Sequence, residues 1–407
     1  MKNNINRRNF VKYLSGASLS SLMPMKYAFS NHHMNDLTDN KILVVLELSG
    51  GNDGLNTIVP YGDDSYYRHR PNIGIKEKDL LKIDNYFGFN PGIVGLESLY
   101  KEGQMAIIHG CGYKDPSFSH FTSMAYMHTA APNSGEEYGW VGRLADEMAP
   151  ESYKNFLINI DKTQSLAVRS KKHVPIVFDH PQRFQREGFY SVKKMLKVDK
   201  NNENNNYQNN SQKFLNEIAI SANEASSLIS DAWAKYTKEV DYGIAPLDLN
   251  KIAALIQAEI PARLYYTSYR DNAFDTHVHQ NNLHQRLLTY ASDAIRGFMN
   301  DLHRIRKEKE VVLLVMTEFG RRVPENTSLG TDHGAAGPMF IIGNTVKGGH
   351  YGQIPDLING LDEGDNLKYT TDFRSVYATL IESWLKTNSQ KILRKNFETF
   401  NIFDTTV

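Results

Sequence analysis

Apolar residues follow two periods along this chain, and the two together predict an α/β fold. Continuous apolar runs, typical of strands buried on both faces, occupy residues 42–48, 105–109, 264–269, 311–317 and 339–342. A stripe at helical spacing covers residues 283–306, and shorter helical patterns cover 92–101, 124–128, 214–240 and 248–258. Because a helical stretch separates the first two apolar runs, we expect a parallel crossover unit at the start of the fold.

The pattern weakens in the middle of the chain. Between about residues 150 and 270 it predicts only short strands, at 151–160 and 174–178, besides the helical stretches. Residues 199–212 are rich in asparagine and offer almost nothing to bury, which predicts a mobile surface loop. We therefore expect one core domain over residues 31–407 with an inserted, partly helical region or cap at about 150–270. Residues 61–90 are expected to be a loop-rich excursion.

The first 30 residues have the pattern of an export signal. Arg7 and Arg8 precede a moderately apolar stretch, and Ala28-Phe29-Ser30 forms a small-x-small cleavage site. Paired arginines indicate the twin-arginine route, so we expect the mature protein in the periplasm or outside the cell. The alternative is a basic N-terminal helix that is retained. Neither this stretch nor any later one is long and apolar enough for a membrane span.

Composition limits the chemistry and the partners. The 46 basic and 46 acidic residues balance, which argues against nucleic acid as a partner. The single cysteine, Cys111, excludes an internal disulfide and a cysteine-based zinc site. Any metal must therefore be held by aspartate, glutamate, histidine or a hydroxyl group.

Potential metal ligands lie where predicted strands meet loops. Asp53 follows the first apolar run and a pair of glycines, although aspartate before glycine also caps turns. Asp275 and His277 are two residues apart and would point the same way in an extended segment. Glu318 follows a buried strand as Asp53 does, and His333 lies in a glycine-flanked loop. Oxygen and nitrogen donors of these kinds bind zinc, manganese, magnesium or calcium.

A candidate nucleophile lies in the loop that follows residues 105–109. Ser119, or else Ser117, starts a predicted helix, where a hydroxyl group is commonly an N-cap. The same position favours a nucleophile, because the helix dipole and free N–H groups stabilise the anion that forms there. His120 lies beside Ser119 and could bind a metal or move protons.

These segments together resemble the domain-of-unknown-function 1501 family. The resemblance covers the leader and almost all of the mature chain, and it rests on the segments at Arg7-Arg8, Leu48–Asn56, Ser119–Phe121, Gly139–Arg143, Asp275–His277, Thr317–Arg321 and Gly330–Gly334. That family is similar to the alkaline phosphatase and sulfatase superfamily. The resemblance implies a three-layer core with a mainly parallel sheet, metal ligands at strand ends and a hydroxyl nucleophile at a helix start.

The resemblance also implies roles for single residues. Asp53, Asp275, His277, Glu318 and His333 would hold a divalent metal, Ser119 would attack, and Arg143 or Arg321 would steady anionic oxygens. Phe319 departs from the superfamily, because a phenyl ring stands where a second metal usually has a histidine ligand. One metal, such as calcium or magnesium, fits that departure. The residues around Cys111 lack the proline and arginine of a formylglycine sulfatase.

Two hypotheses follow from the sequence. The first is an exported metal-dependent hydrolase or transferase that acts on phosphate or sulfate esters of a small molecule or glycan. The second is a binding or scaffold protein that retains the fold with a degenerate metal site.

Overall fold

The computed structural model describes residues 40–182 and 225–403. The predicted leader, the asparagine-rich loop at 199–212 and part of the predicted helical stretch 214–240 lie outside these residues. Within the two described ranges, no helix is long and apolar enough to cross a membrane.

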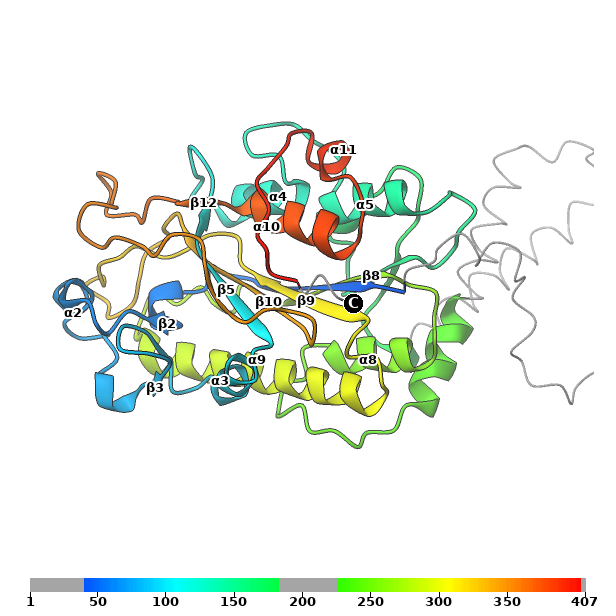
Figure 1. Ribbon diagram of the computed structural model, residues 1–407, viewed down its shortest axis with the longest axis horizontal. Helices are drawn as coiled ribbons and strands as arrows, with labels where there is room; N and C mark the ends of the chain where they lie inside the picture. The colour runs from blue at the N-terminus through cyan, green and yellow to red at the C-terminus, as the bar shows by residue number, and fades with distance from the viewer. Residues whose placement is uncertain (1–39, 183–224, 404–407) are drawn as a thin grey trace, which may run out of the picture. The chain divides into compact units, whose positions relative to one another are not determined.

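A nine-stranded sheet forms the centre of the fold, and it is mainly parallel as the sequence predicts (Figure 1). Its order is β11-β5-β10-β9-β1-β8-β6-β7, with β12 beside β5. The strands are β1 (Ile42–Leu48), β5 (Met105–Gly112), β6 (Leu157–Ile160), β7 (Ile176–Phe178), β8 (Leu264–Tyr269), β9 (Val311–Met316), β10 (Gly337–Ile342), β11 (Gly349–Tyr351) and β12 (Thr371–Asp372).

Strand β1 lies inside the sheet, parallel to both β8 and β9. All seven of its residues are buried, which is why its sequence is continuously apolar except for Glu47. The strands β5 and β1 are not neighbours, because β10 and β9 lie between them. Strand β10 is antiparallel to both of its neighbours. Because β1, β8 and β9 are parallel, their carboxyl ends lie at the same edge of the sheet.

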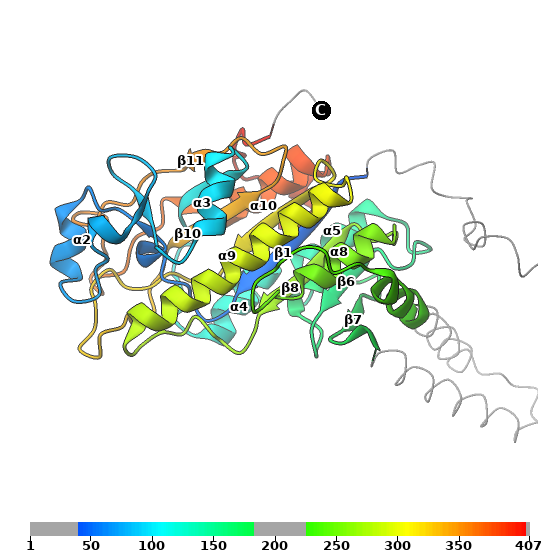
Figure 2. The same ribbon diagram turned by 90° about the horizontal axis from the view of Figure 1, so that it is seen from below.

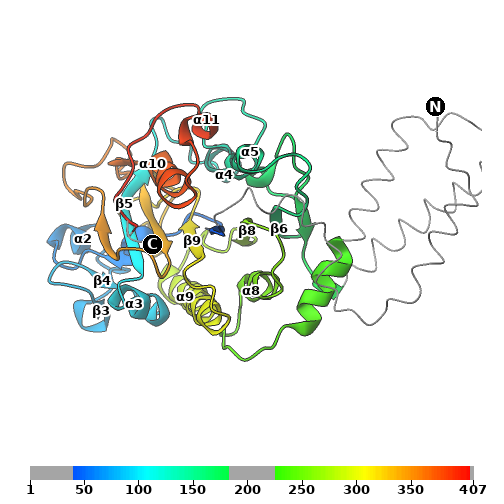
Figure 3. The same ribbon diagram turned by 45° about the vertical axis from the view of Figure 1, so that its right-hand side comes forward.

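Helices cover both faces of the sheet (Figures 1 and 3). On one face lie α3 (Val94–Lys101), α8 (Leu249–Gln257) and the long α9 (Gln280–Arg304), which runs in about the same direction as β1 in Figure 2. On the other lie α4 (His120–Thr129), α5 (Trp140–Met148), α10 (Phe373–Thr379) and α11 (Ser389–Leu393). The apolar stripe of α9 is buried as predicted, including Leu287, Ala294, Phe298 and Leu302. The protein thus has a three-layer α/β/α arrangement.

Two regions differ from the sequence-based expectation. The excursion at 61–90 contains the helix α2 (Asp64–His69) and two short strands, β3 (Leu81–Lys82) and β4 (Gly88–Phe89). The two strands form a small second sheet with β2 (Ile58–Val59). Within the region expected to be an insertion, β6 and β7 are part of the main sheet, beside β8, which the sequence predicts as a core strand. Short apolar runs are ambiguous in sequence, and here β6 is placed by pairing with β8 and β7 by pairing with β6.

Candidate metal centre

The loops that follow β1, β8 and β9 meet at the carboxyl edge of the sheet. The backbone of Gly50 has a φ of +116°, and a Cβ atom there would lie 2.5 Å from the amide nitrogen of Asp275. The Gly50 N–H donates to Glu318 Oε1 over 2.9 Å. Glycine is therefore required for both the conformation and the close approach of the two loops. This packing places Asp275 and Glu318 near each other, although 43 residues separate them in the chain.

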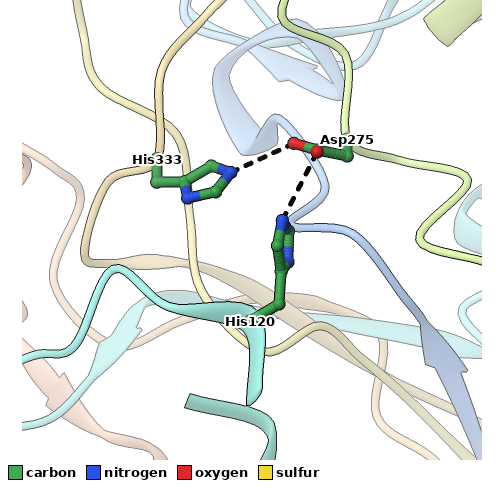
Figure 4. Close-up of side chains that lie close together, drawn as sticks. All are labelled: His120, Asp275 and His333. Atoms are coloured by element: carbon green, nitrogen blue, oxygen red, sulfur yellow. Dashed lines mark hydrogen bonds and ion pairs between the residues drawn. The ribbon is translucent and has the colours of Figure 1, made fainter. Parts of the chain in front are cut away.

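Three imidazoles surround the Asp275 carboxylate. Its Oδ1 atom lies 2.9 Å from His277 Nε2 and 3.1 Å from His333 Nε2. Its Oδ2 atom lies 3.4 Å from His120 Nε2. The two Nε2 atoms of His277 and His333 are 2.9 Å apart. Figure 4 shows His120 and His333 pointing at the carboxylate from two sides.

The other ring nitrogen of each histidine faces an oxygen acceptor. His120 Nδ1 is 2.7 Å from Glu318 Oε1, and His333 Nδ1 is 2.7 Å from the Phe118 carbonyl oxygen. His277 Nδ1 is 3.3 Å from Asp332 Oδ1. Because a carbonyl or carboxylate can only accept, each Nδ1 donates in these contacts. The Nε2 atoms of His277 and His333 are likewise at hydrogen-bond distance from Asp275 Oδ1, and a bound metal would replace a proton on Nε2. All three Nε2 atoms thus lie 2.9–3.4 Å from one carboxylate, and those of His120 and His333 form with it a group that could hold a metal.

The groups around Asp275 favour the ionised form of its carboxylate. Burial alone would raise the pKa of Asp275, but hydrogen bonds from Arg321 and His333 lower it to about 2. The hydrogen bond to Glu318 raises the pKa of His120. Burial lowers the pKa of His333 below its ordinary value. Asp275 is therefore a negative centre at neutral pH, and His333 favours the neutral form that binds metals.

Arg321 fixes the position of Asp275. Its side chain is buried, and one of its terminal nitrogens donates to Asp275 Oδ1 over 2.7 Å. Its other N–H groups donate to backbone carbonyls of the surrounding loops, including Gly51 at 2.7 Å and Thr331 at 2.9 Å, and the nitrogen that reaches Thr331 also lies 3.4 Å from His277 Nε2. The arginine holds the loops after β1, β8 and β9 together. Since these donors are engaged, its role is positioning rather than contact with a substrate.

The donor set fits a divalent transition metal. Ligand atoms of His120, Asp275 and His333 lie within 4.8 Å of one another, and this is the single such group within residues 40–182 and 225–403. The Nε2 atom of His120 is buried and has no hydrogen-bond partner among the residues that the structure describes. Imidazoles with one carboxylate suit zinc, iron or manganese better than calcium or magnesium, which prefer oxygen. The outer carboxylate and carbonyl contacts are those that orient metal-binding histidines.

Comparison with protein families identifies the chain. A sequence model described as "Protein of unknown function (DUF1501)" matches residues 40–380. The chain belongs to the DUF1501 family. A comparison with curated proteins gives no match.

Several solved structures are distantly similar to this DUF1501 protein. One is a protein in the alkaline phosphatase superfamily from Vibrio parahaemolyticus, with 13% identity, a TM-score of 0.37 and coverage of 78% of this chain. This chain spans 63% of the length of that protein. Another is Ps i-CgsB, with 10% identity, a TM-score of 0.32 and coverage of 88% of this chain and 73% of that one. The same protein in complex with k-i-k-neocarrahexaose has 8% identity.

Asp53 does not belong to the group that His120, Asp275 and His333 form in the DUF1501 protein. It is buried, and it caps the turn Gly54–Asn56 by accepting from the Leu55 N–H over 3.2 Å. Its Oδ2 atom accepts from Arg70 over 2.7 Å and from Gln280 over 2.5 Å. The capping alternative therefore describes its contacts, and the proposed metal centre below does not include it.

The sequence suggests Glu318 as a metal ligand, but in the structure it contacts a histidine of the group from outside. Its carboxylate contacts the Gly50 N–H and His120 Nδ1, and it is completely buried. The neighbouring Phe319 packs its ring 5.0 Å from the His120 ring centre and 4.7 Å from that of His333. Glu318 thus orients His120, and Phe319 packs beside His120 and His333.

Ser119 precedes the first residue of α4 and is exposed. Among the described residues, its side chain makes no capping hydrogen bond, whereas its N–H donates to Ser117 Oγ over 3.2 Å. It is adjacent to His120 in the chain. Ser117 is half-buried and its oxygen accepts that bond.

Arg143 is part of the packing of α5. Its guanidinium is buried and donates to the carbonyl oxygens of Ile392 at 2.8 Å, Thr129 at 2.6 Å and Tyr138. These contacts join α5 to the end of α4 and to α11. Because these carbonyls occupy the guanidinium, the geometry does not support the expected contact of Arg143 with anionic oxygens of a substrate.

Replacing Arg143 by alanine is expected to lower the free energy of unfolding by about 2–4 kcal/mol, because three carbonyls lose a charged donor. Metal content of the folded protein should not change. Denaturant titration and elemental analysis measure the two effects, with Arg296→Ala, which removes a surface pair with Glu102, as the control. Loss of metal at unchanged stability would contradict this structural role.

Proposed function

We propose that the protein is an exported, metal-dependent hydrolase or transferase of phosphate or sulfate esters. One observation carries the proposal: the Nε2 atoms of three histidines lie 2.9–3.4 Å from the Asp275 carboxylate, while each Nδ1 is held from outside. Asp275, His277, His333 and His120 would hold one divalent metal there. The predicted leader and the ester class come from the sequence and belong to the same proposal.

A bound divalent metal would act as a Lewis acid on an ester oxygen and lower the pKa of an attacking hydroxyl group. The chain itself would supply position and charge. Arg321 holds Asp275, Glu318 holds His120, and the Phe118 carbonyl holds His333. Ser119, exposed at the start of α4, would be the attacking group, helped by the free N–H groups of the helix start.

A binding protein without catalysis is the second candidate. The observation that favours it is the engagement of both arginines that the sequence suggested as contacts for anionic oxygens. In that case the metal would stabilise the loops or bind an anion, and the ligand would be a small molecule or glycan.

An ester screen separates the two candidates. The exported protein starting near Asn31, purified without chelator and supplied with zinc, manganese, calcium or magnesium in turn, is tested on phosphomonoesters, phosphodiesters and sulfate esters. We expect turnover that depends on zinc or manganese and falls at least about 100-fold in Ser119→Ala, with metal content unchanged. Metal binding with no turnover of any ester would support the binding protein instead.

The outer carboxylate can be tested separately. Glu318→Gln keeps the shape and an acceptor oxygen but removes the charge that faces His120 Nδ1. We expect metal affinity to fall about 10–100-fold, as is typical when an outer partner of a metal-binding histidine is changed. Competition with a chelating dye measures the affinity. The control is Glu97→Gln, which alters only a surface pair with Lys101, and equal affinity of both variants would contradict the role of Glu318.

A further inference from the structure

A fully buried glutamine side chain links the loops that carry the candidate ligands. Gln280 is the first residue of α9. Its Nε2 atom donates to Asp53 Oδ2 over 2.5 Å. Its Oε1 atom accepts from the hydroxyl group of Thr331 over 2.6 Å and from that of Thr276 over 3.2 Å. Both threonines and Asp53 are buried as well, so these contacts form in the absence of bulk water.

The partners of Gln280 fix the direction of its amide. A carboxylate can only accept, so the amide nitrogen must face Asp53. The amide oxygen then faces the threonines, and its two lone pairs accept one hydroxyl group each. An amide turned the other way would place its oxygen against the Asp53 carboxylate, with no water to separate them. Gln280 therefore has a single orientation, in which one oxygen atom joins two loops.

Each of the two threonines stands next to candidate ligands in the chain. Thr276 lies between Asp275 and His277, and Thr331 lies two residues before His333. The carbonyl of Thr331 also accepts, over 2.9 Å, from the arginine that holds Asp275. The backbones of the two loops share one hydrogen bond, from the Thr331 N–H to the Thr276 carbonyl over 3.3 Å. The two hydroxyl contacts on one amide oxygen thus fix the separation of the loops.

We propose that Gln280 is a positioning residue of the metal centre, which holds the loop of Asp275 and His277 against the loop of His333. This inference rests on the proposed function. Loss of the amide would leave two buried hydroxyl groups without their acceptor, and the loops would move to satisfy them. A shift of about 0.5 Å is enough to disturb a metal site. Asp53→Ala, in contrast, leaves both hydroxyl contacts in place, so it should cost stability rather than metal.

Variants of similar shape test this role through the zinc affinity. Thr331→Val removes the hydroxyl group, and Gln280→Met removes the amide. We expect each to weaken zinc binding about tenfold, the lower end of the range for groups outside the ligands of a metal. Thr331→Ser keeps the hydroxyl group and should bind zinc as the unaltered protein does. The double variant should bind no more weakly than Gln280→Met, because both changes remove the same contact. Competition with a chelating dye measures the affinities.

A buried threonine elsewhere in the fold separates positioning from a general loss of stability. Thr379 in α10 is fully buried, and its hydroxyl group donates to the Ser375 carbonyl over 2.7 Å and accepts from the Phe400 N–H over 2.9 Å. Thr379→Val should destabilise the protein and leave the zinc affinity unchanged. An equal zinc affinity of folded Thr331→Val and Thr379→Val, or additive losses in the double variant, would overturn the inference.

The metal-free protein separates this inference from the proposed function. Gln280→Met should speed amide hydrogen exchange in residues 275–277 and 331–333 and leave the exchange of α10 unchanged, as measured by mass spectrometry. Zinc binding that Gln280→Met does not weaken, with unchanged exchange in both loops, would overturn the inference alone. Absence of zinc binding in the unaltered protein would overturn the proposed function and this inference with it.

Discussion

Replacing Asp275 by alanine is expected to weaken metal binding by at least two orders of magnitude. The carboxylate is the one negative donor among the proposed ligands, and Arg321 and His333 hold its pKa at about 2, so it is ionised at neutral pH. Without it, three imidazoles and the Arg321 guanidinium would be left facing the cation. Titration of zinc against a competing chelator at neutral pH measures the change.

Two controls make this result specific. Asp79→Asn changes an exposed aspartate in the short helix Glu77–Asp79 and should bind zinc as the unaltered protein does. Circular dichroism should show that Asp275→Ala is folded, because the side chain is partly exposed and its loss leaves Arg321 with its backbone partners. Zinc affinity unchanged in a folded Asp275→Ala protein would refute the centre.

Replacing Asp53 by alanine is expected to reduce stability rather than metal binding. Asp53 and Arg70 form an ion pair of 2.7 Å in which both side chains are almost fully buried. Removing the carboxylate leaves a buried cation whose remaining partners are neutral oxygens, including Asn56 Oδ1 at 2.6 Å. Breaking such a pair costs about 3–5 kcal/mol of unfolding free energy. Denaturant titration measures the loss, and elemental analysis should find the same metal content in the folded variant.

The pH dependence gives a second readout for Asp53. Burial would raise its pKa, but the charge of Arg70 and then that of His284 hold it below the ordinary value. A depressed pKa in the folded state stabilises the protein above about pH 4 and loses that contribution as the pH falls through the folded value. The stability difference between the parent protein and Asp53→Ala should therefore narrow below about pH 4. Loss of metal from Asp53→Ala at unchanged stability would restore Asp53 as a ligand.

The sequence predicts the central strands and the long helix well. The run Ile42–Leu48 is a strand over the same residues, because a strand buried on both faces requires apolar residues without interruption. The stripe that begins at Leu283 belongs to a helix that starts at Gln280, a few polar residues earlier. Both patterns are strong since each extends over several turns or a full strand.

The sequence is less informative where the position of a segment or side chain depends on what it contacts in the fold. The segment at 157–160 is too short to distinguish an insertion from a strand of the main sheet, and its pairing with β8 decides. The site shows the same limitation. His120 and Glu318 are both recognisable in the sequence as polar residues near strand ends. Only their contact of 2.7 Å in the structure shows that His120 faces Asp275 and that Glu318 holds His120 from behind. Arg321 and Arg143 likewise need the fold to show that carbonyls occupy their donors.

The most direct test of the metal centre is the X-ray absorption spectrum of the zinc-loaded protein. Scattering from imidazole rings distinguishes histidine ligands from oxygen ligands and gives their number. The account predicts three imidazoles and one carboxylate in the parent protein and two imidazoles in His120→Ala. A zinc shell of oxygen atoms alone, or a spectrum unchanged by the loss of His120, would contradict it.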